Sequence, residues 1–194
     1  MKNNKGYTLI EMLIVIAIMV ILSGLSIYSI GIIRSAKRSA AVDSFDDQIS
    51  SCYVKTKAVS DVSDAALDPS KGNKVCMLIR KRTNKDGVTN YCIKVGYDLG
   101  AAGVADITKG TPVNNDDDLT WDAILPKDVA LITLTEKSGG TANDVTEQKI
   151  FFNKSVGSVD EGYGYYDFYK SNGEAFAQVF IDESTGKHQI VYGR

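Results

Sequence analysis

The 194-residue chain has few of the residues from which metal sites, disulfide scaffolds and catalytic dyads are built. It contains one histidine and three cysteines, and no two cysteines form a CxxC pair. A zinc site needs a cluster of such ligands, and a disulfide scaffold needs more cysteines at closer spacing. The net charge of -2 gives no excess of basic residues for binding nucleic acid. We therefore expect no metal, no cofactor, no direct nucleic-acid partner and no enzymatic activity.

Charge is also missing from one long stretch near the start of the chain. Met12–Ile33 is a run of 22 residues without a charged side chain. At about 1.5 Å per residue, a helix of this length spans about 33 Å, enough to cross a hydrocarbon core of ~30 Å. Three basic residues follow it, Arg34, Lys37 and Arg38, and the rest of the chain has the composition of a soluble globular domain.

Two ordinary interpretations of this N-terminus account for only part of it. A secretory signal peptide has a basic start, here Lys2 and Lys5, but its apolar region is usually ~7–15 residues and ends at a small-x-small cleavage site. A signal anchor fits the length, with the lysines in the cytoplasm. Neither interpretation explains Glu11, because a charge inside a membrane segment is costly.

The residues Gly6-Tyr7-Thr8-Leu9-Ile10-Glu11, followed by the apolar run, resemble the processing site of type IV prepilins and pseudopilins. The resemblance implies that a prepilin peptidase cuts between Gly6 and Tyr7 and that the new amino group of Tyr7 is methylated. It also implies that Glu11 pairs with the amine of a neighbouring subunit during assembly. The expected parts are a leader at residues 1–6, a transmembrane and filament-core helix at 7–33, and a globular domain at 34–194.

The same resemblance implies partners and a location. The expected partners are other pilin or pseudopilin subunits, the peptidase, the cytoplasmic membrane and the assembly platform of the inner membrane. The chain would cross that membrane once, with its N-terminus in the cytoplasm, before it joins a filament at the cell surface. Two positions depart from the family pattern: Tyr7 replaces the usual phenylalanine, and Tyr28 stands where many type IV pilins carry a proline.

The remaining pattern predicts an α+β fold, in which one long N-terminal helix packs against an antiparallel sheet as in pilins. Apolar residues at 42, 45, 49, 52 and 59 form a helical stripe, and Pro69 and Gly72 end the helix after about residues 62–67. Strand patterns follow at residues 74–82, 88–96, 129–135, 148–153, 165–169, 175–182 and 188–192. The tyrosines near 165 suit a strand with an inner and an outer face.

The C-terminal half carries a second resemblance. The segments "LPKDVAL", "YDFYKSNGEA" and "IVYGR" are similar to minor pilins and to minor pseudopilins of the H type. The N-terminal motif is shared by subunits of pili, of type II secretion pseudopili and of DNA-uptake (competence) machines. It therefore does not distinguish which of these three assemblies the chain belongs to. The alternative to a filament subunit is a membrane-anchored extracellular binding domain.

Three further features have a functional and a structural interpretation each. Cys76 and Cys92 lie an even number of residues apart on two predicted hairpin strands, so they are candidates for a disulfide. The acidic segment Asn114–Asp122, inside the long loop Tyr97–Lys127, suits either a calcium site or a solvated turn, and it lacks the EF-hand spacing. His188 has no recognisable catalytic partners and is expected to be a strand residue.

Overall fold

A computed structural model describes residues 8–58, 74–98, 104–106, 120–136 and 139–193. The chain divides into two compact units, Met1–Lys37 and Arg38–Arg194. A single helix, α1 (Leu9–Ala58), contributes to both. Its predicted continuation beyond residue 58 lies outside the described residues.

In the first unit, α1 is continuous through Gly24 and Gly31, and a Cβ at either glycine would meet no atom within 4 Å. The hydroxyls of Ser23 and Ser29 donate to the backbone carbonyls four residues earlier. These bonds satisfy the polar side chains within the helix itself, which suits an apolar environment. The segment is long and apolar enough to cross a membrane.

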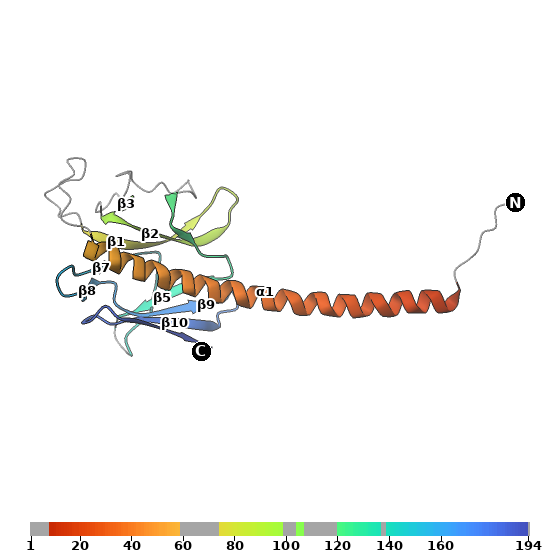
Figure 1. The fold of residues 1–194 in the computed structure, drawn as a ribbon. Helices are drawn as coiled ribbons and strands as arrows, with labels where there is room; N and C mark the ends of the chain where they lie inside the picture. Colours follow the sequence, from red (N-terminus) through yellow and green to blue (C-terminus); the bar gives the residue numbers. More distant parts are fainter. Residues whose placement is uncertain (1–7, 59–73, 99–103, 107–119, 137–138, 194) are drawn as a thin grey trace. The chain divides into compact units, whose positions relative to one another are not determined.

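In the second unit, two antiparallel sheets pack against one face of the C-terminal part of α1 (Figure 1). Sheet A has the order β3-β2-β1-β7-β8, with β4 also paired to β2. Its strands are β1 (Val75–Thr83), β2 (Thr89–Asp98), β3 (Val104–Asp106), β4 (Ala123–Ile124), β7 (Glu147–Phe152) and β8 (Val159–Glu161). Sheet B has the order β11-β10-β9-β5-β6. Its strands are β5 (Leu131–Thr135), β6 (Asn143–Asp144), β9 (Gly164–Tyr169), β10 (Ala175–Ile181) and β11 (His188–Tyr192).

The α+β class is thus correct, but the strands form two sheets where the sequence suggested one. All seven predicted strands are present within a few residues of their expected ends. Four further strands, β3, β4, β6 and β8, were not predicted. Each has only two or three residues, which is too short for an alternation of apolar and polar residues to be recognised in the sequence. Along β9 the side chains alternate between buried and half-buried, so its tyrosines lie on two faces, as predicted.

The core of the second unit is formed where the predicted helical stripe meets both sheets. Val42, Phe45, Ile49 and Cys52 are fully buried. The ring of Phe45 packs edge-on against Phe168 of sheet B, with centroids 5.2 Å apart. The stripe buries one face of α1 because apolar residues at these intervals lie on the same side of a helix.

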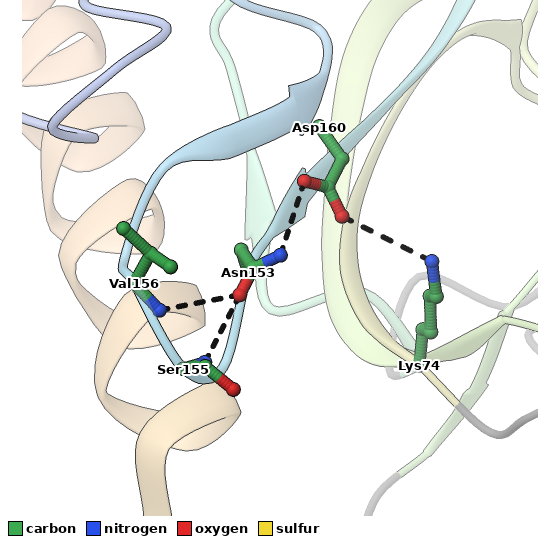
Figure 2. A network of polar contacts seen from close by, with 5 residues as sticks. All are labelled: Lys74, Asn153, Ser155, Val156 and Asp160. Carbon is green, nitrogen blue, oxygen red and sulfur yellow. Dashed lines mark hydrogen bonds and ion pairs between the residues drawn. The ribbon is translucent and has the colours of Figure 1, made fainter.

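The end of α1 is held by the turn between β7 and β8 (Figure 2). Asn153 shapes this turn, because its side-chain oxygen accepts hydrogen bonds from the backbone N–H groups of Ser155 and Val156. Its amide group donates to Asp160, whose carboxylate lies 3.9 Å from the ammonium of Lys74. From the helix, Lys57 donates to the carbonyl of Lys154 at 2.6 Å. The turn therefore links the last turn of α1 to sheet A.

Candidate functional site at the start of the helix

The candidate site is the first turn of α1, where Thr8 and Glu11 cap each other. The backbone N–H of Thr8 donates to Oε2 of Glu11 at 2.8 Å, and the Thr8 hydroxyl donates to the same oxygen at 2.9 Å. In return, the backbone N–H of Glu11 donates to the Thr8 hydroxyl oxygen at 3.3 Å. This arrangement is a capping box, which satisfies backbone donors that have no partner inside the helix.

The electrostatics of this turn favour a carboxylate. The N-terminus of a helix carries a partial positive charge, and an acidic side chain there typically stabilises the helix by about 0.3–1 kcal/mol. The contacts with Thr8 use only Oε2 of Glu11. The other oxygen of the carboxylate, Oε1, takes no part in the cap, so it can accept a hydrogen bond from a donor outside this turn.

An apolar surface begins directly at this polar turn. Leu9 is 84% exposed and Ile10 66% exposed. The described side chains of residues 9–25 and 29–33 are all exposed, on every side of the helix. A helix that is apolar all round needs a membrane or other apolar helices around it, so the carboxylate of Glu11 lies at the border of a surface that other molecules must cover.

Of the predicted processing and assembly residues, the structure describes Glu11. Gly6 and Tyr7, the two residues of the expected cleavage site, lie outside the described residues. Glu11 is in the first turn of α1, four residues after Tyr7. The sequence interpretation did not identify the capping role of Thr8, although the T-x-x-E pattern before an apolar run is its usual signal.

The predicted disulfide is corrected by the strand register. Cys76 and Cys92 do share the outer face of sheet A, in a buried cluster with Trp121. However, β1 and β2 pair Cys76 with Gly96 and Cys92 with Arg80. The cysteines are thus four residues apart along the strands, or about 13 Å at ~3.3 Å per residue, whereas a disulfide needs Cα atoms within about 7 Å. All three cysteines are free and buried.

Burial makes these thiols weak acids. It raises the pKa of Cys52 to about 12, and it also raises the pKa values of Cys76 and Cys92. The thiolate is the reactive form of cysteine. The three thiols are therefore unreactive near neutral pH while the domain is folded.

His188 lies on β11 and joins that strand to α1. Its Nε2 atom is 3.2 Å from Oδ1 of Asp46 and 3.3 Å from the hydroxyl of Ser50. In a serine-histidine-aspartate triad the acid and the serine contact different ring nitrogens. Here both contact the same nitrogen, so the cluster has the geometry of a structural link between helix and strand.

The acidic loop is described only at its end. Asn114–Leu119 lie outside the described residues. Asp122 forms an ion pair of 2.9 Å with Lys94 and accepts a hydrogen bond of 2.8 Å from the backbone N–H of Val95. The carboxylate of Asp122 is thus engaged in holding this segment against β2.

Residues 1–27 match the family model of the prokaryotic N-terminal methylation motif. This is the cleavage motif of type IV pilins and pseudopilins, whose members are structural rather than enzymatic. The matched range includes the Thr8–Glu11 turn and most of the apolar run. No match was found among curated proteins or among solved structures. The motif supports a processed subunit of the pilin or pseudopilin type.

Proposed function

We propose that this chain is a structural subunit of a type IV pilus or a related filament. A prepilin peptidase removes residues 1–6 by cutting between Gly6 and Tyr7, and the new amino group of Tyr7 is methylated. Residues 7–33 first anchor the chain in the cytoplasmic membrane and then form the filament core with other subunits. Residues 34–194 form the globular domain that covers this core.

The observation that supports this proposal most strongly is the exposed apolar surface that follows the methylation motif. The described side chains of residues 9–25 and 29–33 are all exposed, and most of them are large and apolar. Each fully buried large apolar side chain contributes about 1.5–3 kcal/mol relative to exposure in water. Lipid provides this burial before assembly, and the helices of neighbouring subunits provide it afterwards.

Glu11 has two roles in this proposal. Before assembly, its Oε2 atom caps the helix together with Thr8. In the filament, the carboxylate also compensates the charge on the methylated amine of a neighbouring Tyr7. Removing one member of a buried charge pair costs about 3–5 kcal/mol, because the other charge is left without compensation. A subunit at the wrong height would carry this cost, so Glu11 sets the register between subunits.

The N-terminus lies in the cytoplasm before cleavage, and the chain crosses the membrane once. The assembly platform of the inner membrane and other subunits are its partners. A role as a minor pseudopilin, in a type II secretion or DNA-uptake machine, is the second candidate. It is favoured by the segments around Pro126, Tyr169 and Gly193, which are similar to minor pseudopilins of the H type.

Two variants separate the capping role of Glu11 from its charge. Glu11→Gln keeps a side chain that serves in a capping box but removes the charge. Thr8→Val removes the hydroxyl of the cap and keeps the charge, at a cost of about 1 kcal/mol in helix stability. Both variants are expected in the membrane at normal abundance.

The readout is the amount of each variant in sheared filaments. Glu11→Gln is expected to fall by more than a hundredfold relative to the unaltered chain, whereas Thr8→Val stays within about tenfold of it. Glu11→Gln in filaments at normal amounts would show that the charge has no role in assembly. Equal losses for the two variants would assign the effect to the helix cap instead.

A further inference from the structure

The last strand of the second unit, β11, forms one edge of sheet B (Figure 1). It pairs with β10 from Ala177↔Tyr192 to Ile181↔His188 without a register shift. In the described part of the chain, no strand pairs with its other side. A strand at a sheet edge presents a row of backbone N–H and C=O groups that have no partner strand.

The hydrogen bonds to β10 show which backbone groups of β11 point to this free edge. At one end of the pair, the N–H of Asp182 donates to the carbonyl of Lys187, and at the other end the N–H of Gly193 donates to the carbonyl of Phe176. In an antiparallel pair, residues that bond the partner strand alternate with residues that do not. The odd-numbered residues of this stretch therefore bond β10. The backbone groups that point to the free edge belong to the even-numbered ones, His188, Ile190 and Tyr192.

The other described edge strands of the two sheets are protected in ways that β11 is not. β3, β4, β6 and β8 have two or three residues each, whereas β11 has five. β3, β6 and β8 each contain an acidic residue, and β8 also has a register shift against β7. β11 contains no acidic residue, lysine, arginine or proline, and its Val191 and Tyr192 are 44% and 47% exposed. Short strands, charges and bulges usually keep other chains off a sheet edge, so β11 is the described edge most open to pairing.

The side of α1 next to this edge is acidic. Nε2 of His188 lies 3.2 Å from Oδ1 of Asp46, and the Tyr192 hydroxyl donates to Asp43, so both carboxylates lie beside β11. Asp47 follows Asp43 by four residues and therefore lies about one turn further on the same side of α1. Asp43 and Asp47 are exposed. Burial raises the pKa of Asp46, His188 opposes this increase, and the charges of Asp47 and Asp43 add to it, so the three carboxylates act on one another.

Basic side chains are scarce on this side of the domain. Residues 39–54 of α1 contain no lysine or arginine. Lys55 and Lys57 are in the last turn of α1, and Lys57 is bonded to the β7–β8 turn. Arg38 interacts with Glu174 in the β9–β10 turn. Lys187 lies in the turn before β11, together with two acidic residues. A segment that pairs with β11 therefore meets carboxylates that basic side chains would compensate.

We propose that β11 binds an extended segment of another protein, which joins sheet B as a sixth strand and carries basic side chains on the positions that face α1. Its backbone pairs with the outward N–H and C=O groups of β11, as in complexes in which a peptide adds a strand to a sheet edge. In an antiparallel arrangement, its side chains opposite His188, Ile190 and Tyr192 point to the same face as these residues. They therefore face α1 and the carboxylates of Asp43 and Asp47.

A foreign segment fits this edge better than the β11 strand of a second copy. If two copies of β11 paired, the two α1 helices would lie on the same face of the joined sheet, with their acidic sides towards each other. Like charges at short distance repel. A basic segment turns the same carboxylates into a source of attraction.

The test uses the full isotope-labelled chain in micelles of an uncharged detergent, with a synthetic peptide as the probe. The peptide has blocked ends and the sequence TKTVTKT, so that its lysines and valine share one face of a strand. NMR spectra report each backbone amide of β11. In the free chain, the amides of His188, Ile190 and Tyr192 should exchange rapidly with solvent, whereas β10 protects those of Gln189 and Val191.

The peptide is expected to shift the signals of the three outward amides and to slow their exchange. Methylating the backbone nitrogens of its lysines and valine removes the three N–H groups that face β11, which should weaken binding about tenfold or more. The control peptide is methylated on the threonine nitrogens between them. It keeps these three bonds and should bind nearly as well as the unmodified peptide.

Two further changes test the charge of the partner. Replacing both lysines of the peptide by glutamates should remove detectable binding, because like charges would then face each other. Asp47→Asn should weaken binding of the lysine peptide about twofold to fivefold, the range of an exposed ion pair. The control Asp86→Asn alters an exposed carboxylate on the β1–β2 turn and should leave binding unchanged.

Protection of the Ile190 amide in the free chain would show that the edge is already covered and would overturn the proposal. No binding up to the solubility limit of the peptide, or equal affinities of the two methylated peptides, would also overturn it. Shifts of the outward amides that follow the protein concentration and not the peptide would assign the edge to a second copy. None of these measurements requires a filament, so a failure here leaves the proposed filament function untouched.

Discussion

Truncation of Phe45 tests whether α1 is part of the core of the second unit. Phe45 is fully buried and contacts two aromatic rings of sheet B, Phe168 at 5.2 Å and Tyr166 at 5.4 Å between centroids. Phe→Ala substitutions in a core typically cost about 3–5 kcal/mol, and aromatic pairs add about 0.5–1.5 kcal/mol beyond the buried area. Since both rings lose a partner, we expect Phe45→Ala to lower the free energy of unfolding by about 4–5 kcal/mol.

The assay is urea unfolding of the full chain in detergent micelles, followed by tryptophan fluorescence. Trp121 is the single tryptophan and is 7% exposed, in the cluster on the outer face of sheet A. It therefore reports the unfolding of the sheets and not a local change near Phe45. The control Val54→Ala alters a 61% exposed side chain of the same helix and should change the free energy by less than about 0.5 kcal/mol. A loss below about 1 kcal/mol for Phe45→Ala, with an unchanged urea dependence, would refute the packing of this face of α1 against the sheets.

Further predictions concern a turn, a titrating group and the thiols. Gly186→Ala should destabilise the domain by about 2 kcal/mol or more in the same assay, because Gly186 has a φ of 65° and a Cβ there would overlap the carbonyl oxygen of Gly157. Burial raises the pKa of Asp46, partly opposed by His188, so its contribution to stability is fully present below the ordinary carboxyl pKa and is lost as the pH rises through the raised value. Asp46→Asn should therefore raise the urea midpoint at neutral pH and leave it unchanged near pH 3. Alkylation followed by mass measurement should find three unmodified thiols in the folded chain and three modified ones in urea, and a protected pair in urea would indicate a disulfide.

The periodic part of the fold could be predicted from the sequence. Residues 42, 45, 49 and 52 recur at helical intervals, and all four are fully buried. The hairpin of β1 and β2 was also predictable, because two apolar runs flank a turn that contains Gly87, which has a φ of 74°. These features depend on local patterns, which a sequence contains in full.

Features that depend on register or on other parts of the chain were not predictable. An even spacing gave the shared face of Cys76 and Cys92, but their distance depends on which residues of β1 and β2 pair, and that is set by the turn Asn84–Val88. The division into two sheets depends on how β5, β9 and β10 pair across long sequence separations. No local pattern contains this information.

At the start of α1, the sequence interpretation identified one role of Glu11 and missed another. The sequence interpretation treated Glu11 as a charge in need of a partner from another subunit. In the structure, Glu11 also has a partner within the same chain, because Thr8 donates two hydrogen bonds to its carboxylate. The two interactions are compatible because they can use different oxygens of one carboxylate. A motif can thus carry a local structural role and an assembly role in the same residue.

The mass of the mature chain isolated from its native membrane tests the central proposal most directly. We predict a chain that begins at Tyr7, lacks residues 1–6 and carries one methyl group on its N-terminal amine. Replacing Gly6 with a bulky residue should leave the precursor uncut, because the peptidase must approach the backbone beside it. A native chain that retains Met1–Gly6, or one that is cut beyond Ser23, would contradict the assignment as a pilin-type subunit.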